Sequence, residues 1–177
     1  GRRDRAAAHG FDLACQGADL IDIGGESTRP GAEPPGVDEE LDRVVPVVER
    51  LARVTALPLS VDTSRPEVMR AAVRAGASMI NDVAALTHDP ALGPLVAGTG
   101  LPLCLMHAQG TPATMQSDPR YDDVLLDVYD WLEARVQAAE AMGIERARII
   151  VDPGIGFGKT VDHNLTLIRG LALFHGL

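Results

Sequence analysis

The chain has 177 residues, 46% of them hydrophobic, which is typical of a single folded domain with a substantial core. Its formal net charge of -9 at pH 7 disfavours nucleic acid and anionic membranes as partners, and no apolar run approaches the roughly 20 residues that span a bilayer. Two distant cysteines in apolar surroundings, Cys15 and Cys104, predict buried free thiols in a reducing cytoplasm.

Short apolar runs alternate with helical patterns along the whole chain. The predicted order is helix 3–16, strand 20–23, helix 38–53, strand 57–62, helix 65–75, strand 77–81, helix 89–98, strand 101–107, helix 120–142, strand 147–152 and helix 161–174. The sequence Ser64-Arg-Pro-Glu67 predicts a capping box at the start of the third helix. In the last helix we expect Leu165, Ile168 and Leu171 on the apolar face.

Such regular alternation predicts an α/β fold with parallel strands and right-handed crossovers. A doubly wound sheet and a (β/α)8 TIM barrel both satisfy this pattern. Polar residues at the end of every strand, without a glycine-rich dinucleotide motif, favour the barrel. Because five strands cannot close a barrel, we expect one domain over residues 1–177 that is incomplete at both ends and holds about five βα units after a first helix.

The first strand leads directly into a loop suited to a ligand. Asp22 interrupts the apolar run, so its carboxylate must be hydrogen-bonded or face a site. Gly24 and Gly25 permit close approach of the backbone to a bound molecule. Thr28 and Arg29 then offer a hydroxyl group and a cationic fork that suit phosphate or carboxylate.

The stretch from Gly17 to Pro30 resembles a signature of the dihydropteroate synthases, the pterin-binding barrel enzymes of folate biosynthesis. Further motifs of that family match in the same order: Ser60-Val-Asp-Thr-Ser64, Ile80-Asn-Asp-Val83, Leu105-Met-His-Ala-Gln-Gly110 and Asp152-Pro-Gly-Ile-Gly-Phe-Gly-Lys159. The resemblance therefore spans essentially the whole chain. It implies a transferase that condenses 6-hydroxymethyl-7,8-dihydropterin diphosphate with p-aminobenzoate to give 7,8-dihydropteroate and diphosphate.

The resemblance implies a pterin site made by Asp62, Asn81 and Asp152, with Met106 packed against the ring. Carboxylates can accept the N–H groups of a pterin, and an amide can both donate and accept. The family's chemistry gives Asp62 and Asp152 a catalytic role, because they would anchor the pterin and favour the developing cation. From the residues alone, each of these side chains is equally well explained as a helix cap or as a brace for its own loop.

The family resemblance also assigns the diphosphate group and p-aminobenzoate to two loops of this chain. Thr28 matches the position that contacts the diphosphate, while Arg29 and Pro30 belong to a loop beside the p-aminobenzoate. Gly156 and Phe157 match part of the p-aminobenzoate pocket. The simpler alternatives are a solvated turn for the first loop and ordinary core packing for Phe157.

Two further residues are interpreted as structural. His107 has no second His or Cys at ligand spacing, so we expect a hydrogen-bonded structural histidine rather than a metal ligand or an acid–base catalyst. Residues 153–160 nearly spell a phosphate-binding P-loop, but Pro153 stands where that pattern needs glycine, which disfavours ATP binding. Lys159 is then expected near a loop-to-helix junction, either solvated or hydrogen-bonded to neighbouring loops.

The family's mechanism is substitution at the pterin methylene carbon, with Mg²⁺ neutralising the departing diphosphate. The Asn that binds the metal in the family lies in a segment outside this chain, so we assign no metal ligand here. Later segments with Ser-Arg-Lys and Arg-x-His are also outside it. We therefore expect the chain to be an internal segment of a longer synthase, inactive in isolation and a homodimer at full length.

Two alternatives remain open at this stage. One is a pterin-binding methyltransferase, which holds methyltetrahydrofolate in a related barrel for a corrinoid partner. The stretch Gly25-Glu-Ser-Thr-Arg-Pro30 speaks against it. The other is a non-catalytic paralogue that binds pterins without turnover.

Overall fold

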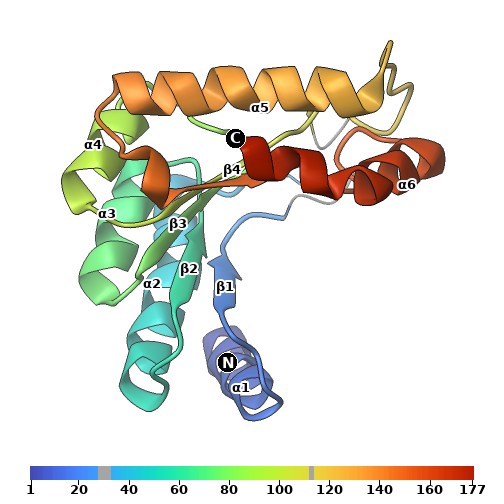
Figure 1. Cartoon of the computed structure of the whole chain (residues 1–177). Coiled ribbons are helices and arrows are strands. Elements are labelled where there is room, and N and C mark those ends of the chain that lie inside the picture. The colour runs from blue at the N-terminus through green and yellow to red at the C-terminus, as the bar shows by residue number, and fades with distance from the viewer. Residues whose placement is uncertain (28–32, 112–113) are drawn as a thin grey trace.

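The computed structural model describes residues 1–27, 33–111 and 114–177, in which five parallel strands alternate with helices (Figure 1). In chain order the elements are α1 (Arg2–Cys15), β1 (Ile21–Gly24), α2 (Val37–Val54), β2 (Leu59–Asp62), α3 (Pro66–Ala75), β3 (Met79–Asp82), α4 (Leu92–Thr99), β4 (Leu103–Met106), α5 (Val124–Ala141), the 3₁₀ turn η1 (Arg146–Arg148), β5 (Ile149–Asp152), α6 (Val161–Arg169) and the 3₁₀ turn η2 (Leu171–Gly176). The predicted α/β alternation is confirmed.

The strands pair in chain order, β1-β2-β3-β4-β5, and every pair is parallel. Gly24 lies opposite Asp62, Asp62 opposite Asn81, and Met106 opposite Asp152. The carboxyl ends of the strands therefore meet along one edge of the sheet. Within the described residues the sheet is open, because β1 and β5 each pair with one neighbour only.

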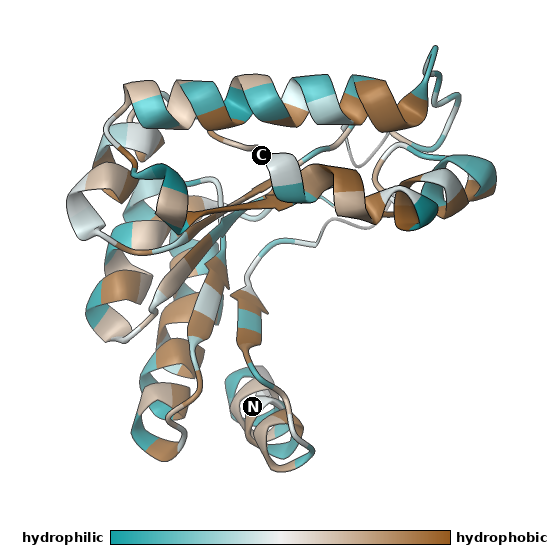
Figure 2. Cartoon of the chain, viewed as in Figure 1, coloured by the Kyte–Doolittle hydropathy of each residue, from teal (hydrophilic) through white to brown (hydrophobic). Residues whose placement is uncertain are grey.

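The two faces of the sheet differ because side chains alternate along a strand. The residues Ile23, Val61, Ile80 and Leu105 belong to the large core that the strands form with the helices. The strands are accordingly mostly brown in Figure 2, whereas β1 shows a hydrophilic band between two hydrophobic ones. That band agrees with its sequence Ile-Asp-Ile-Gly, in which Asp22 alternates with the buried isoleucines. Asp22 thus points away from the helices, whereas Asp82 shares the buried side of β3 with Ile80.

The last helix differs from the expectation. α6 ends at Arg169, and the packed residue is Leu167, which is fully buried with Val128 and Leu132 of α5. The predicted face is wrong, since Leu165 is 44% exposed and Ile168 is 55% exposed. The physical reason is that the main packing partner of α6 among the helices is α5, so only one narrow stripe of α6 is covered.

Two local predictions are also corrected. The side chain of Ser64 does not cap α3, which begins at Pro66; its hydroxyl donates instead to Oδ1 of Asp82 at 2.6 Å. The thiol of Cys15 at the end of α1 is exposed, whereas Cys104 is buried as expected; α1 packs mainly against α2. Both cysteines are free thiols, as predicted.

A buried carboxylate joins α2 to the loop after β2. Glu40 is 1% exposed, and its Oε1 accepts a hydrogen bond from the Thr63 hydroxyl at 2.7 Å. Its Oε2 lies 3.1 Å from Nη1 of Arg65, in an ion pair that lacks hydrogen-bond geometry. A buried charge is tolerated only when it is paired in this way.

Glu40→Ala is expected to lower the free energy of unfolding of the full-length gene product by about 3 kcal/mol, because Arg65 loses its buried partner and Thr63 its acceptor. The matched control is Glu39→Ala on the same helical turn, whose exposed ion pair with Arg43 contributes no more than about 1 kcal/mol. Urea unfolding of the two variants measures the difference. Equal losses would contradict a structural role for the buried pair.

Candidate functional site

The floor of the candidate site is a row of polar side chains on the strand face that points away from the helices. Asp62 ends β2, and Asn81 lies opposite it on β3. Nδ2 of Asn81 donates to Oδ2 of Asp22 on β1 at 3.3 Å. Three neighbouring strands therefore contribute two carboxylates and one amide to a small area of the sheet.

Acidic groups crowd around Asp62. Burial is the main reason that its pKa rises from 3.8 to about 7, and the negative charges of Asp22, Asp82, Glu40 and Glu26 raise it further. Near neutral pH this carboxyl group therefore exchanges readily between its protonated and ionised forms. A ligand that donates hydrogen bonds to the carboxylate would favour ionisation.

The second predicted carboxylate, Asp152, stands at the end of β5 and shapes the loop that follows. Its Oδ1 accepts a hydrogen bond from the backbone N–H of Gly154 at 2.7 Å, and its backbone carbonyl accepts one from the N–H of His107 at 2.9 Å. The loops after β4 and β5 are thus joined at this point. In the described structure the side chain of Asp152 braces its own loop, which was the alternative to pterin binding that the sequence left open for each of these residues.

A cavity of about 530 Å³ opens above the strand ends, and its walls include Asp62, Met106 and Phe157. These three predicted residues come from β2, β4 and the loop after β5. Asn81, Asp152 and Gly156 are not part of the cavity wall, although Asn81 lies beside Asp62 in the register. Thr28, Arg29 and Pro30 lie outside the described residues.

Asp82 supports the rim of this cavity and was missed by sequence reasoning. It is fully buried and accepts hydrogen bonds from the Ser64 hydroxyl and from the backbone N–H groups of Ala84 and Leu86 at 2.6, 3.0 and 2.7 Å. The last of these holds Leu86 at a φ of 62°, which branched side chains adopt rarely. A carboxylate at a helix-facing position of β3 was the signal that could have revealed it.

Nδ1 of His107 lies 2.9 Å from Nζ of Lys159, so the expected hydrogen bonding of this histidine is confirmed. It is buried, and its ring meets Trp131 edge-on with 5.0 Å between the ring centres. Burial, together with the charge of Lys159, lowers its pKa to about 4, so the ring is neutral at physiological pH. Trp131 in turn lines the cavity.

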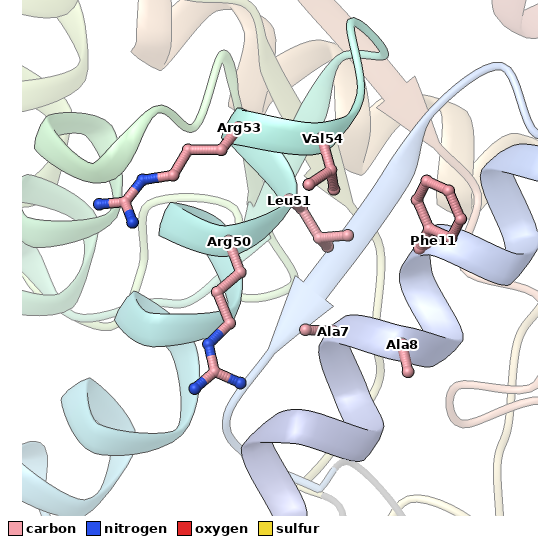
Figure 3. Close-up of a pocket in the computed structure, with 7 residues that line it drawn as sticks. All are labelled: Ala7, Ala8, Phe11, Arg50, Leu51, Arg53 and Val54. Carbon is pink, nitrogen blue, oxygen red and sulfur yellow. The ribbon is translucent and has the colours of Figure 1, made fainter.

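A second hollow, of about 470 Å³, lies far from the strand ends, between α1 and α2 (Figure 3). Phe11 and Ala7 of α1 face Leu51 and Val54 of α2 across it. Its lining is almost wholly apolar, and the side chain of Arg50 on its border is engaged with Asp4. This groove offers no group suited to catalysis.

The metal expected from the family resemblance finds no ligand set in the described residues, because no three His, Cys, Asp or Glu side chains there are arranged to hold an ion. The same described residues include no helix that is both long and apolar enough to cross a bilayer.

A sequence model of the pterin binding enzymes matches residues 2–176. Dihydropteroate synthase of Escherichia coli K12 is 48% identical over 170 residues, covering 96% of this chain and 60% of that enzyme. Xanthomonas albilineans dihydropteroate synthase with 4-aminobenzoic acid superposes with a TM-score of 0.92 at 52% identity, over 99% of this chain and 62% of that one. The X. albilineans enzyme in complex with 7,8-dihydropteroate gives 0.86 at 48% identity, over 98% and 60%. This chain thus spans about three fifths of the length of these relatives.

Asp62→Asn is expected to stabilise the full-length gene product at high pH. A folded-state pKa near 7 means that the stability contributed by the protonated carboxyl group is present below pH 4 and is lost as the pH rises through about 7. The neutral amide keeps that stability, so the gain in unfolding free energy should grow between pH 4 and 7 and level off at about 4 kcal/mol, the free energy that corresponds to a pKa raised from 3.8 to about 7. Urea unfolding against pH tests this, with the exposed Asp19→Asn as the control. A pH-independent difference would contradict the shift.

Asp22→Asn is expected to lower the pKa of Asp62, because it removes the neighbouring charge with the largest effect on that pKa. The carboxyl carbon signal of Asp62, followed by NMR against pH, measures the shift directly. Asp19→Asn, on the loop before β1, should leave the Asp62 titration unchanged. An Asp62 titration that is the same in Asp22→Asn and in the unmodified protein would show that the charge of Asp22 does not raise the pKa of Asp62.

Proposed function

Because this chain belongs to the family of pterin-binding enzymes, we propose that it forms the pterin-binding part of a dihydropteroate synthase. The observation that carries the proposal is the arrangement of Asp62 and Asn81 on neighbouring strands, beneath a cavity that Met106 and Phe157 also line. The carboxylates of Asp22 and Asp62, the amide of Asn81 and an apolar cavity wall suit a flat heterocycle with several N–H groups. Relatives of similar fold bind 4-aminobenzoic acid or 7,8-dihydropteroate.

In the proposed reaction the bond from the pterin methylene carbon to the diphosphate oxygen breaks, and diphosphate leaves with the electron pair. The amine nitrogen of p-aminobenzoate forms the new bond to that carbon and releases a proton. Asp62, Asn81 and Asp152 would hold the pterin, while Met106 would pack on its ring. Catalysis then rests on holding both substrates in line and on negative charge near the developing cation.

The raised pKa of Asp62 adds a pH dependence to this scheme. The carboxylate form accepts a pterin N–H, whereas the protonated form has lost part of that capacity. Pterin binding should therefore strengthen as the pH rises through about 7, and binding should release a proton when it is measured below that value.

The p-aminobenzoate would lie on the side of Phe157 and Gly156, and the diphosphate near Thr28, with Arg29 and Pro30 beside the p-aminobenzoate. Mg²⁺ would neutralise the diphosphate when bound. The described residues contain no group of three His, Cys, Asp or Glu side chains that could hold it, and we assign it no ligand in this chain. A homodimer, a cytoplasmic location and a single domain completed by segments beyond these residues belong to the same proposal.

The test is diphosphate release by the full-length gene product, which must depend on p-aminobenzoate and yield 7,8-dihydropteroate. Asp62→Ala and Asp152→Ala are expected to lower kcat/KM by about 100-fold or more, because each removes a charged anchor from the pterin. Asp19→Ala is the control and should retain activity. Near-normal turnover in both site variants would refute their role.

The same assay separates the alternatives. A methyltransferase would transfer the methyl group of methyltetrahydrofolate to a corrinoid and release no diphosphate. A non-catalytic paralogue would bind the pterin, as calorimetry can show, without forming product. Either result would overturn the synthase.

A further inference from the structure

Lys159 is the single lysine among the 16 lysine and arginine residues of the chain. It is only 3% exposed, although lysine is among the residues most rarely buried. Arginine serves at every other cationic position. A compact ammonium group therefore stands at a position that is enclosed by protein.

Three acceptors surround the ammonium group of Lys159. Nζ lies 2.9 Å from Nδ1 of His107, 3.0 Å from the carbonyl oxygen of Phe157 and 3.4 Å from the carbonyl oxygen of His107. An ammonium group has three N–H donors, so the protonated side chain can satisfy each acceptor with one proton. Because Nδ1 accepts, the neutral His107 ring carries its proton on Nε2.

These bonds join two loops that are already in close contact. Gly154 has a φ of +67°, and a Cβ atom there would overlap the carbonyl oxygen of His107. Gly158 also has a φ of +67°, and a Cβ atom there would overlap the carbonyl oxygen of Gln109. The Tyr121 hydroxyl donates to the carbonyl of Gly158 at 2.8 Å. Phe157 thus stands on a short loop whose two ends are fixed against the loop after β4.

We propose that Lys159 is a positioning residue for p-aminobenzoate: it holds the Phe157 carbonyl against the His107 loop and thereby fixes the Phe157 side of the cavity. This inference rests on the proposed function. It assigns Lys159 no contact with either substrate. Its effect should fall on the p-aminobenzoate side, because the carbonyl that Lys159 holds is that of Phe157 itself. The pterin anchors Asp62 and Asn81 belong to β2 and β3, away from this loop. The third anchor, Asp152, is held separately by the backbone N–H groups of Gly154 and His107.

The hydrogen bonds from Lys159 to the two loops are expected to weaken at high pH. Burial lowers the pKa of Lys159 to about 8, while the charge of Asp152 opposes that shift. Three other titratable groups lie near Lys159. The His107 ring is neutral above about pH 4, and the pKa of the Tyr121 hydroxyl is raised to about 12. The negative charge of Asp127 acts to raise the pKa of both His107 and Tyr121. Loss of one proton from Lys159 leaves two donors for three acceptors. The KM for p-aminobenzoate should therefore rise above about pH 8 in the unmodified protein.

The decisive variant is Lys159→Met in the full-length gene product, which keeps the apolar stem and removes the ammonium group. We expect the KM for p-aminobenzoate to rise about tenfold at pH 7, equivalent to one lost hydrogen bond to a charged group, with little change in the KM for the pterin diphosphate. Lys159→Arg should also raise the KM for p-aminobenzoate, because a planar guanidinium group cannot replace three donors on one nitrogen atom. Arg120→Met, which removes an 83%-exposed cation near the same loops, is the matched control and should leave both KM values unchanged.

A second measurement does not depend on turnover. Amide hydrogen exchange at residues 154–158 should be about tenfold faster in Lys159→Met than in the unmodified protein, in line with one lost hydrogen bond. Equal changes in both KM values, or unchanged exchange at 154–158, would overturn the inference. Absence of turnover in the unmodified protein would refute the proposed function instead, and the exchange rates would still decide the role of Lys159. If Lys159→Met fails to fold, the KM rise above pH 8 in the unmodified protein decides it.

Discussion

The structure depends on the alternation of side chains along very short parallel strands. Each strand has four residues, so only two side chains reach each face. Helix-facing side chains such as Val61 and Ile80 are apolar and close the core, and the intervening positions are left for chemistry. Asp62 and Asn81 lie side by side for this reason alone: the parallel register that packs the core also aligns the strand ends. Core packing therefore determines the position of the site, and the residues at the carboxyl ends of the strands determine its chemistry.

Buried charged side chains then hold the rim of the site. Glu40 reaches from α2 to the loop after β2, Asp82 supports the loop after β3, and Lys159 joins the loops after β4 and β5. Each uses hydrogen bonds to satisfy a charge that would otherwise be costly to bury. The negative members of this group also raise the pKa of Asp62, so the rigidity of the rim and the protonation of the floor are coupled.

Sequence alone predicts the order of strands and helices, because period-two and 3.6-residue patterns follow directly from core packing. It also points to Asp62 and Asn81, since polar residues at the ends of successive strands must meet at one edge. It misjudges Ser64, because a hydroxyl near a helix start has the same local pattern whether it caps that helix or bonds a buried carboxylate from another strand. The prediction of the buried face of α6 is wrong for a similar reason. The helical pattern is compatible with more than one buried face, and the packing against α5 determines that Leu167 is the buried residue. The pairing of Lys159 with His107 joins residues 52 positions apart and leaves no local trace.

The burial of the single lysine also determines the chemical character of the protein surface. Every other lysine or arginine position of these 177 residues is arginine, so their side-chain positive charge outside Lys159 is carried by guanidinium groups. Guanidinium groups stay charged at any physiological pH and are poor nucleophiles. Within these residues, acylating reagents and amine cross-linkers therefore find no exposed ε-amine, and they can reach Lys159 only when the loops around it separate. Modification at this one side chain would report how often that separation occurs.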